Sequence, residues 1–141
     1  MSRANLQFAV AVHVMAALGA HHGEEMRSCE LALSVNADGS FVRRVISKLA
    51  KAGLVSTTRG KAGACCLARP PAQITLLDIY RASEAPAAFT FHDYPVTKQC
   101  QVSRHIKHCM EPVLDRAQDG FEQVLARETL ADVVERIKQE K

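Results

Sequence analysis

The sequence predicts a mostly α-helical fold that carries one small β-hairpin. Two observations support this fold class: apolar residues recur at helical spacing in several segments, and one short stretch is β-branched and flanks a glycine-containing loop. The 141 residues suit a single domain, and 48% hydrophobic with 23% charged residues is ordinary for a globular protein. No run of eighteen apolar residues occurs, so we expect no membrane span. The N-terminus has no leader-like apolar run, and a cytoplasmic location is expected.

The first third of the chain predicts a helix-turn-helix. Residues 5–20 have the apolar spacing of a helix, and Ser28 is expected to cap a short helix over 29–33. After a turn at 36–40, a third helix over 39–53 has one apolar face, formed by Phe41, Val42, Val45, Ile46 and Leu49. Helix, short helix, turn and basic helix is the order of this motif.

A β-hairpin follows the basic helix, as in a winged helix-turn-helix. The segments 54–58 and 64–68 are compatible with two strands joined by the basic loop 59–63. Thr75 then begins a short helix that runs to about residue 85. We therefore predict a winged helix-turn-helix DNA-binding domain over residues 1–85.

The remainder predicts a loop over 86–101 and a long helix with a second apolar face. The face recurs in steps of three and four residues from Val102 onwards, and Pro112 predicts either a kink or a restart. Thr129 is expected to cap a last helix through Ile137. As a monomer the chain would expose this stripe, so we expect residues 102–141 to form a homodimer. The stripe consists of Ile106, Met110, Val113, Ala117, Phe121 and Val124.

The charge distribution favours a polyanionic partner. The net charge is only +3, yet no acidic residue lies between Gly39 and Gln73, where seven basic residues occur. A solvated basic face is the alternative from charge alone. Together with the motif order and the wing, the pattern predicts binding to double-stranded DNA, with Arg43 or Arg44 contacting bases and the lysines contacting phosphates. The predicted contacts are Ser28, Ser40, Arg43, Arg44, Lys48, Arg59, Gly60 and Lys61.

Several ordered motifs resemble one bacterial family. The runs LAKAGLV (49–55), RGKAG (59–63), LARP (67–70), ITLLDI (74–79) and TLADV (129–133) resemble the Rrf-type (IscR/NsrR/CymR/YwnA-like) winged-helix transcriptional regulators. The resemblance implies a dimeric transcription factor, usually a repressor, that binds a palindromic operator. Family members usually carry Gly-Gly-Tyr or Gly-Gly-Phe in the wing, where this chain has Gly63-Ala64-Cys65. Cluster-binding members have three cysteines before the long helix, whereas only Cys100 and Cys109 lie there, so no iron–sulfur cluster or other cofactor is expected.

Cys100 is the predicted redox sensor. It precedes the long helix and is flanked by Lys98, Arg104 and Lys107, and both the helix N-terminus and these cations favour the thiolate. Cys109 lies nine helical residues away, roughly 13 Å along the axis. Because a disulfide needs Cα atoms within about 7 Å, a bond between the two cysteines is expected between subunits rather than within one chain.

Other interpretations of the C-terminal half stay open at this stage. His105, His108 and Cys109, with Cys100 or His92, form a weak candidate metal site, and a small ligand at the dimer helix is a further alternative. A thiol enzyme is less favoured because no cysteine has a defined His and Asp partner, so we expect no enzymatic activity. The third alternative is a protein-interaction module that does not bind DNA. His13 and Cys29 lie on apolar helical faces and are expected in the core.

Overall fold

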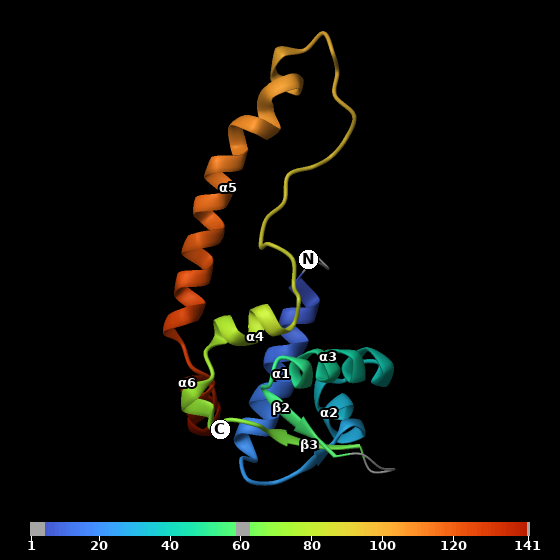
Figure 1. The fold of residues 1–141 in the computed structure, drawn as a ribbon, viewed down its shortest axis with the longest axis vertical. Helices are drawn as coiled ribbons and strands as arrows, with labels where there is room; N and C mark the ends of the chain where they lie inside the picture. Colours follow the sequence, from blue (N-terminus) through green and yellow to red (C-terminus); the bar gives the residue numbers. More distant parts are fainter. Residues whose placement is uncertain (1–4, 59–62, 141) are drawn as a thin grey trace.

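The computed structural model describes residues 5–58 and 63–140, and it shows a compact winged-helix body from which one long arm projects (Figure 1). The arm consists of the segment after α4, which rises from the body, and of α5, which returns to it. The elements are α1 (Leu6–Ala20), β1 (Met26–Arg27), α2 (Ser28–Val35), α3 (Gly39–Lys51), β2 (Val55–Thr57), β3 (Ala64–Leu67), the 3₁₀ helix η2 (Pro71–Gln73), α4 (Leu76–Ala82), α5 (Gln101–Arg127) and α6 (Leu130–Gln139). This architecture confirms the predicted fold class.

The core of the body surrounds α1. Its buried face packs against α2, α3, α4 and α6, and the apolar face predicted for residues 39–53 is buried except for the half-buried Phe41. Burying each such large side chain stabilises the fold by roughly 1.5–3 kcal/mol. Fully buried core residues include Met15, Leu18, Leu31, Leu49, Ile79 and Leu130.

Side-chain caps set the starts of three helices. Asp38 accepts a hydrogen bond from Phe41 N at 3.2 Å, and Thr75 and Thr129 accept from the amides of Asp78 and Asp132. The predicted cap by Thr129 is therefore confirmed.

The prediction that Ser28 caps α2 is wrong. Ser28 is the first residue of the helix, and the Glu30 carboxylate instead accepts from the backbone amide of Arg27 at 3.1 Å. The Glu30 carboxylate thus satisfies the free amide of the residue that precedes the helix, and no described side chain caps the amides of the first turn.

The wing belongs to a three-stranded antiparallel sheet with strand order β1-β3-β2. The predicted hairpin is present, with Val55 opposite Leu67 and Thr57 opposite Cys65. The added strand β1 pairs Met26 with Cys65 on the other edge of β3. A strand of two residues shows no alternation of apolar and polar side chains, so β1 is recognised only from its pairing with β3.

The long helix α5 is continuous from Gln101 to Arg127, so it does not restart at Pro112. Its C-terminal part docks on α4, where the ring of Tyr80 stands edge-on between those of Phe8 and Phe121, with both centroids at 5.3 Å. Gln118 Nε2 donates to the Tyr80 hydroxyl at 3.1 Å, and Ala88 N donates to Gln118 Oε1 at 2.8 Å. The base of the arm is thereby fixed to the body.

Four helices end within a few residues of the predicted positions: α2 continues to Val35 rather than residue 33, and α3 ends at Lys51 rather than residue 53. Helix α4 ends at Ala82 rather than near residue 85, and α6 continues two residues beyond Ile137. Within the described ranges, no helix is both long enough and apolar enough to cross a membrane.

Candidate nucleic-acid interface and sensor site

Helix α3 presents its basic side chains outward because its opposite face is buried. Val42, Val45 and Leu49 lie in the core, whereas Arg43 and Arg44 are exposed. The Asp38 cap fixes the residue at which α3 begins, and the buried apolar face fixes which side of the helix points outward. The arginines of α3 are therefore exposed to solvent, and the helix lies next to the sheet (Figure 1).

A shallow hollow of about 260 Å³ lies where α2, α3 and the wing meet. It brings together two of the predicted contacts, Ser28 and Arg43, and Ser28 N donates to Gly63 O at 3.3 Å. The sequence prediction missed Ser47 and Thr57, which also line it. Ser47 lies four residues after Arg43 and so shares its helical face, a signal that the sequence offered.

The remaining predicted contacts on α3 have partners within the chain. The Arg44 guanidinium lies 5.6 Å from the Phe41 ring centroid, and the Ser40 hydroxyl donates to the Asp38 carboxylate. The hydrogen bonds from Ser40 and from the Phe41 amide hold the pKa of Asp38 below its usual value. Asp38 therefore stays ionised at the start of α3, where it stabilises the helix N-terminus.

Lys48 is not a free cation in this structure. Its Nζ lies 3.3 Å from Glu84 Oε2, and its side chain is 30% exposed. A phosphate contact by Lys48 would replace this ion pair with Glu84, which follows α4. The other predicted contacts, Arg59, Gly60 and Lys61, lie outside the described residues.

Cys100 lies at the far end of the arm, immediately before α5 (Figure 1). The thiol is exposed, and its Sγ accepts a hydrogen bond from Ser103 N at 3.4 Å. A pocket of about 620 Å³ lies between the loop and the first turns of α5 and includes Cys100 in its wall. Cys109 is also exposed but lies outside this pocket, beside a separate hollow of about 410 Å³.

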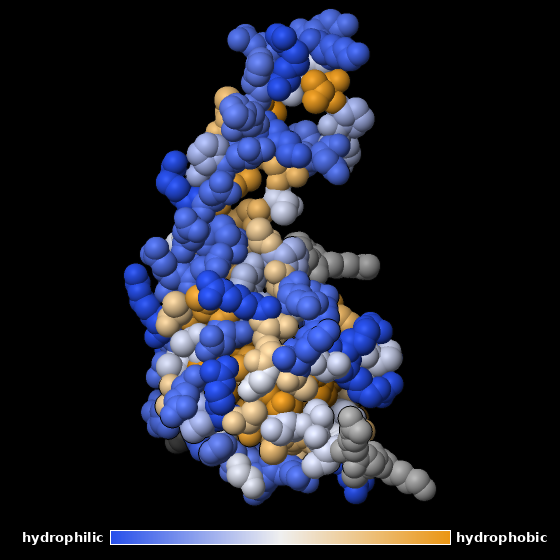
Figure 2. Space-filling view, in the orientation of Figure 1, coloured by the Kyte–Doolittle hydropathy of each residue, from blue (hydrophilic) through white to orange (hydrophobic). Residues whose placement is uncertain are grey.

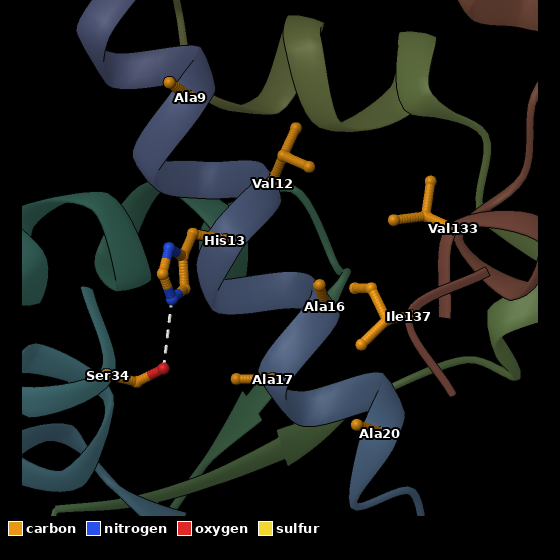
Figure 3. A pocket seen from close by; sticks show the side chains of 9 residues that line it. All are labelled: Ala9, Val12, His13, Ala16, Ala17, Ala20, Ser34, Val133 and Ile137. Atoms are coloured by element: carbon orange, nitrogen blue, oxygen red, sulfur yellow. Dashed lines mark hydrogen bonds between the residues drawn. The ribbon is translucent and has the colours of Figure 1, made fainter. Parts of the chain in front are cut away.

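The two residues expected in the core, His13 and Cys29, are both exposed, so that prediction is wrong. His13 Nε2 is hydrogen-bonded to Ser34 Oγ at 3.0 Å and lines an open apolar hollow of about 400 Å³ between α1 and α6 (Figure 3). The helical pattern alone does not show which apolar positions of α1 a neighbouring element buries. Cys65 is the buried thiol instead, at 1% exposure.

A family model described as "Rrf2: Iron-dependent Transcriptional regulator" matches residues 4–136 of this winged-helix chain. The chain belongs to the Rrf2 family. Among Rrf2-type relatives, the protein named as the HTH-type transcriptional regulator YwnA of Bacillus subtilis is 35% identical over 132 residues, covering 92% of this chain and 96% of YwnA. The predicted resemblance is confirmed, and the chain is a DNA-binding transcriptional regulator rather than an enzyme.

Solved structures show the same fold. A transcriptional regulator from Lactobacillus plantarum superposes with a TM-score of 0.78 at 26% identity, covering 95% of this chain and 91% of that one. CymR of B. subtilis, titled the global cysteine regulator, superposes with a TM-score of 0.67 at 25% identity, covering 96% of each chain. The helical body, the wing and the long α5 are thus features of Rrf2 regulators.

The description of the Rrf2 family names iron, and an iron site requires several His, Cys, Asp or Glu side chains close together. Among the residues that the structure describes, no three His, Cys, Asp or Glu side chains gather as a metal site requires. The candidate residues His105, His108 and Cys109 therefore do not form such a group within one chain. Cys29, Cys65 and Cys66 lie in the winged body, away from Cys100 at the tip of the arm (Figure 1). Within one chain, the described residues therefore do not bring together the ligands that an iron site requires.

Proposed function

We propose that this Rrf2 regulator is a homodimeric repressor that binds a palindromic operator and that reaction of Cys100 changes its affinity for DNA. The observation that carries the dimer is the apolar surface of α5. Val113 and Val124 are 42% and 57% exposed. Figure 2 shows apolar side chains between upper α5 and the loop and a polar outer side. A second copy packed on α5 would bury this surface.

A dimer with two α3 helices would recognise an inverted repeat in the operator. Each α3 would enter one major groove, and each wing would follow the adjacent backbone, so the two-fold axis of the protein would match that of the DNA. A dimer bound across a promoter excludes the polymerase, which is the simplest route to repression.

The link from Cys100 to α3 runs through the arm. Peroxide oxidises the thiolate to a sulfenic acid and is itself reduced to hydroxide. A second thiol then reacts with the sulfenic acid, which forms a disulfide and releases water. Cys109 of a partner subunit is the proposed second thiol, because the two cysteines of one chain lie roughly 13 Å apart along α5. Such a bond would change the relation between the two α5 helices and thereby the spacing of the DNA-binding bodies.

The decisive test compares DNA binding by the reduced and the peroxide-treated protein. An operator is first selected from random DNA with the reduced protein, and we expect an inverted repeat. Oxidation should weaken binding, dithiothreitol should restore it, and Cys100→Ser should remove the response. Cys109→Ser should still bind the operator but form no intersubunit disulfide on a non-reducing gel. Affinity that ignores peroxide would contradict the switch, and a selected site without symmetry would contradict the palindromic dimer.

Repression is tested separately with a reporter that carries the selected operator at its promoter. Expression of the regulator should lower reporter output, and the Arg43→Ala variant should not. Higher output with the regulator present would identify an activator instead.

A further inference from the structure

The pocket at the tip of the arm has the size of a small-molecule site. It measures about 620 Å³, within the range of roughly 300–1,000 Å³ that is usual for ligand pockets. A peroxide molecule would leave most of it empty, since a water molecule occupies only about 30 Å³ in the liquid. The pocket therefore fits a reactant considerably larger than peroxide.

The pocket wall combines apolar contacts with charges of both signs. Val96 and Ile106 contribute apolar surface, whereas Asp93 and Lys107 contribute a carboxylate and an ammonium group. A zwitterionic ligand with an aliphatic body would find an apolar contact and a partner for each of its charges. Cys100 lines the same pocket, so a bound ligand lies beside a thiol.

Local contacts hold the loop side of the pocket in shape. The His92 ring is tilted against the rings of Phe91 and Tyr94, with centroid distances of 4.8 and 5.3 Å. His92 Nδ1 also accepts from Tyr94 N at 3.2 Å. On the helix side, Ser103 Oγ accepts from Thr97 N at 2.8 Å and ties the loop to α5. The loop wall therefore has contacts within itself and one hydrogen bond to the helix wall.

We propose that this pocket binds small disulfides of the amino-acid type, such as cystine, and that they form a mixed disulfide with Cys100. This inference rests on the proposed thiol switch and names its reactant. The Cys100 thiolate attacks one sulfur of the bound disulfide, and the ligand S–S bond breaks as the new S–S bond forms. The departing thiolate keeps the electron pair and takes a proton from water. Cys100 is thereby oxidised and half of the ligand is reduced.

Within one chain, no second thiol can displace the adduct. Cys109 lies outside the pocket and roughly 13 Å along the helix axis. The other three cysteines belong to the winged body. Only Cys109 of the partner subunit could exchange with the mixed disulfide, which would release the second half of the ligand as a thiol and give the intersubunit disulfide proposed above.

The test measures the rates at which individual cysteines react with two disulfides. The reduced full-length protein is mixed with cystine or with the uncharged 2-hydroxyethyl disulfide, quenched with acid and mapped by peptide mass spectrometry. Cys109, exposed on the same helix but outside the pocket, serves as the internal control. We expect the ratio of the cystine rate to the 2-hydroxyethyl rate to be at least about threefold higher at Cys100 than at Cys109, since one exposed charge pair alters a rate by about that factor.

Two lysine variants separate binding in the pocket from general electrostatics. Lys107→Gln should lower the ratio of the cystine rate to the 2-hydroxyethyl rate at Cys100 by about threefold, because a change in the thiolate fraction affects both reagents alike and cancels in the ratio. Lys98→Gln removes an exposed charge that lies close to Cys100 in sequence but outside the pocket, and it should leave the ratio unchanged. Equal ratios at both cysteines, or equal effects of both lysine variants, would overturn the inference.

The inference and the proposed switch can fail separately. DNA affinity of the cystine-treated protein is measured beside that of the peroxide-treated protein. Selective thiolation at Cys100 without a change in DNA affinity would support the pocket and contradict the switch. Peroxide-controlled DNA binding without any selectivity at Cys100 would contradict the pocket and support the switch.

Discussion

Arg43 and Arg44 are neighbours in sequence but have different surroundings. Arg44 lies against the Phe41 ring, and its charge contributes to the lowered pKa of Asp38. Arg43 lines the hollow that the wing and α2 share with α3. Because the hollow opens beside the wing, Arg43 is the better placed of the two to contact a base edge.

Replacing Arg43 with alanine should therefore reduce specificity. An arginine that donates two hydrogen bonds to guanine contributes about 1–3 kcal/mol of discrimination. We expect Arg43→Ala to weaken operator binding by that amount and to alter binding to unrelated DNA much less, as measured by fluorescence anisotropy. Lys51→Ala, exposed on the last turn of the same helix, should weaken both DNAs alike and lower the salt slope by about one. An equal loss on both DNAs for Arg43→Ala would contradict a base contact.

Cys65 makes the stability of the fold depend on alkaline pH. Burial, with a smaller contribution from Cys66, raises the pKa of the Cys65 thiol from 9.0 to about 11. The unfolded thiol ionises from about pH 9, whereas the folded one stays protonated until about pH 11. The stabilisation is therefore fully present below pH 9 and is lost as the pH rises towards 11.

The free energy of unfolding should consequently fall more steeply between pH 9 and 11 in the native sequence than in Cys65→Ala. Urea denaturation under reducing conditions at several pH values measures the difference. Cys66→Ala, at the next position of β3 but only partly buried, should keep most of the steep pH dependence. Parallel curves for the native sequence and Cys65→Ala would contradict the assignment.

At the scale of elements, the contact between α1 and α6 depends on a glycine. A Cβ atom at Gly19 would lie 2.8 Å from Val134 Cγ2, closer than real contacts allow. Val134 and Leu130 of α6 are buried against this part of α1. The absence of a side chain at Gly19 lets the two helices approach, and α6 in turn covers part of the core.

Gly19→Ala should therefore destabilise the protein. Helix propensity favours alanine by about 1 kcal/mol, but overpacking costs about 1–3 kcal/mol, so we expect a net loss of about 1 kcal/mol in urea denaturation. On a Val134→Ala background the same change should no longer be unfavourable. Gly120→Ala on α5, where a Cβ meets nothing within 4 Å, should instead be stabilising. An identical cost for Gly19→Ala on both backgrounds would show that the clash is not the cause.

At the scale of the whole molecule, a winged body with a projecting arm leaves apolar surface that one copy does not bury. Of the residues of α5, only Leu125 is buried, and the N-terminal part of α5 extends away from the body (Figure 1). The proposed dimer accounts for this surface, and it would also place the tip pockets and the two α3 helices in one assembly.

A lysine in the apolar face of α5 should dissociate that dimer. Val113→Lys introduces a charge that the partner helix would have to desolvate. We expect the protein to elute as a monomer in size-exclusion chromatography with light scattering and to lose operator binding. Asp115→Lys lies two residues away, on another side of the same helix, and should stay dimeric. A dimer that survives Val113→Lys would exclude this face as the interface.

The sequence by itself determined the order of the elements, the buried face of α3, the wing strands and the Rrf2 resemblance. These features depend on residues close together in the chain, whose periodicity and turn chemistry are local. The same local pattern correctly placed a cap at Thr129.

Only the tertiary structure decided which surfaces are covered and which groups meet. The strand β1 exists because β3 offers it a free edge, and Lys48 meets Glu84 because α4 ends beside α3. His13 and Cys29 are exposed although both stand at apolar positions of the helical pattern. The pocket at Cys100 requires the loop to fold back against α5. Such contacts join residues far apart in sequence. The periodicity of a helix or strand carries no information about which distant element packs against it.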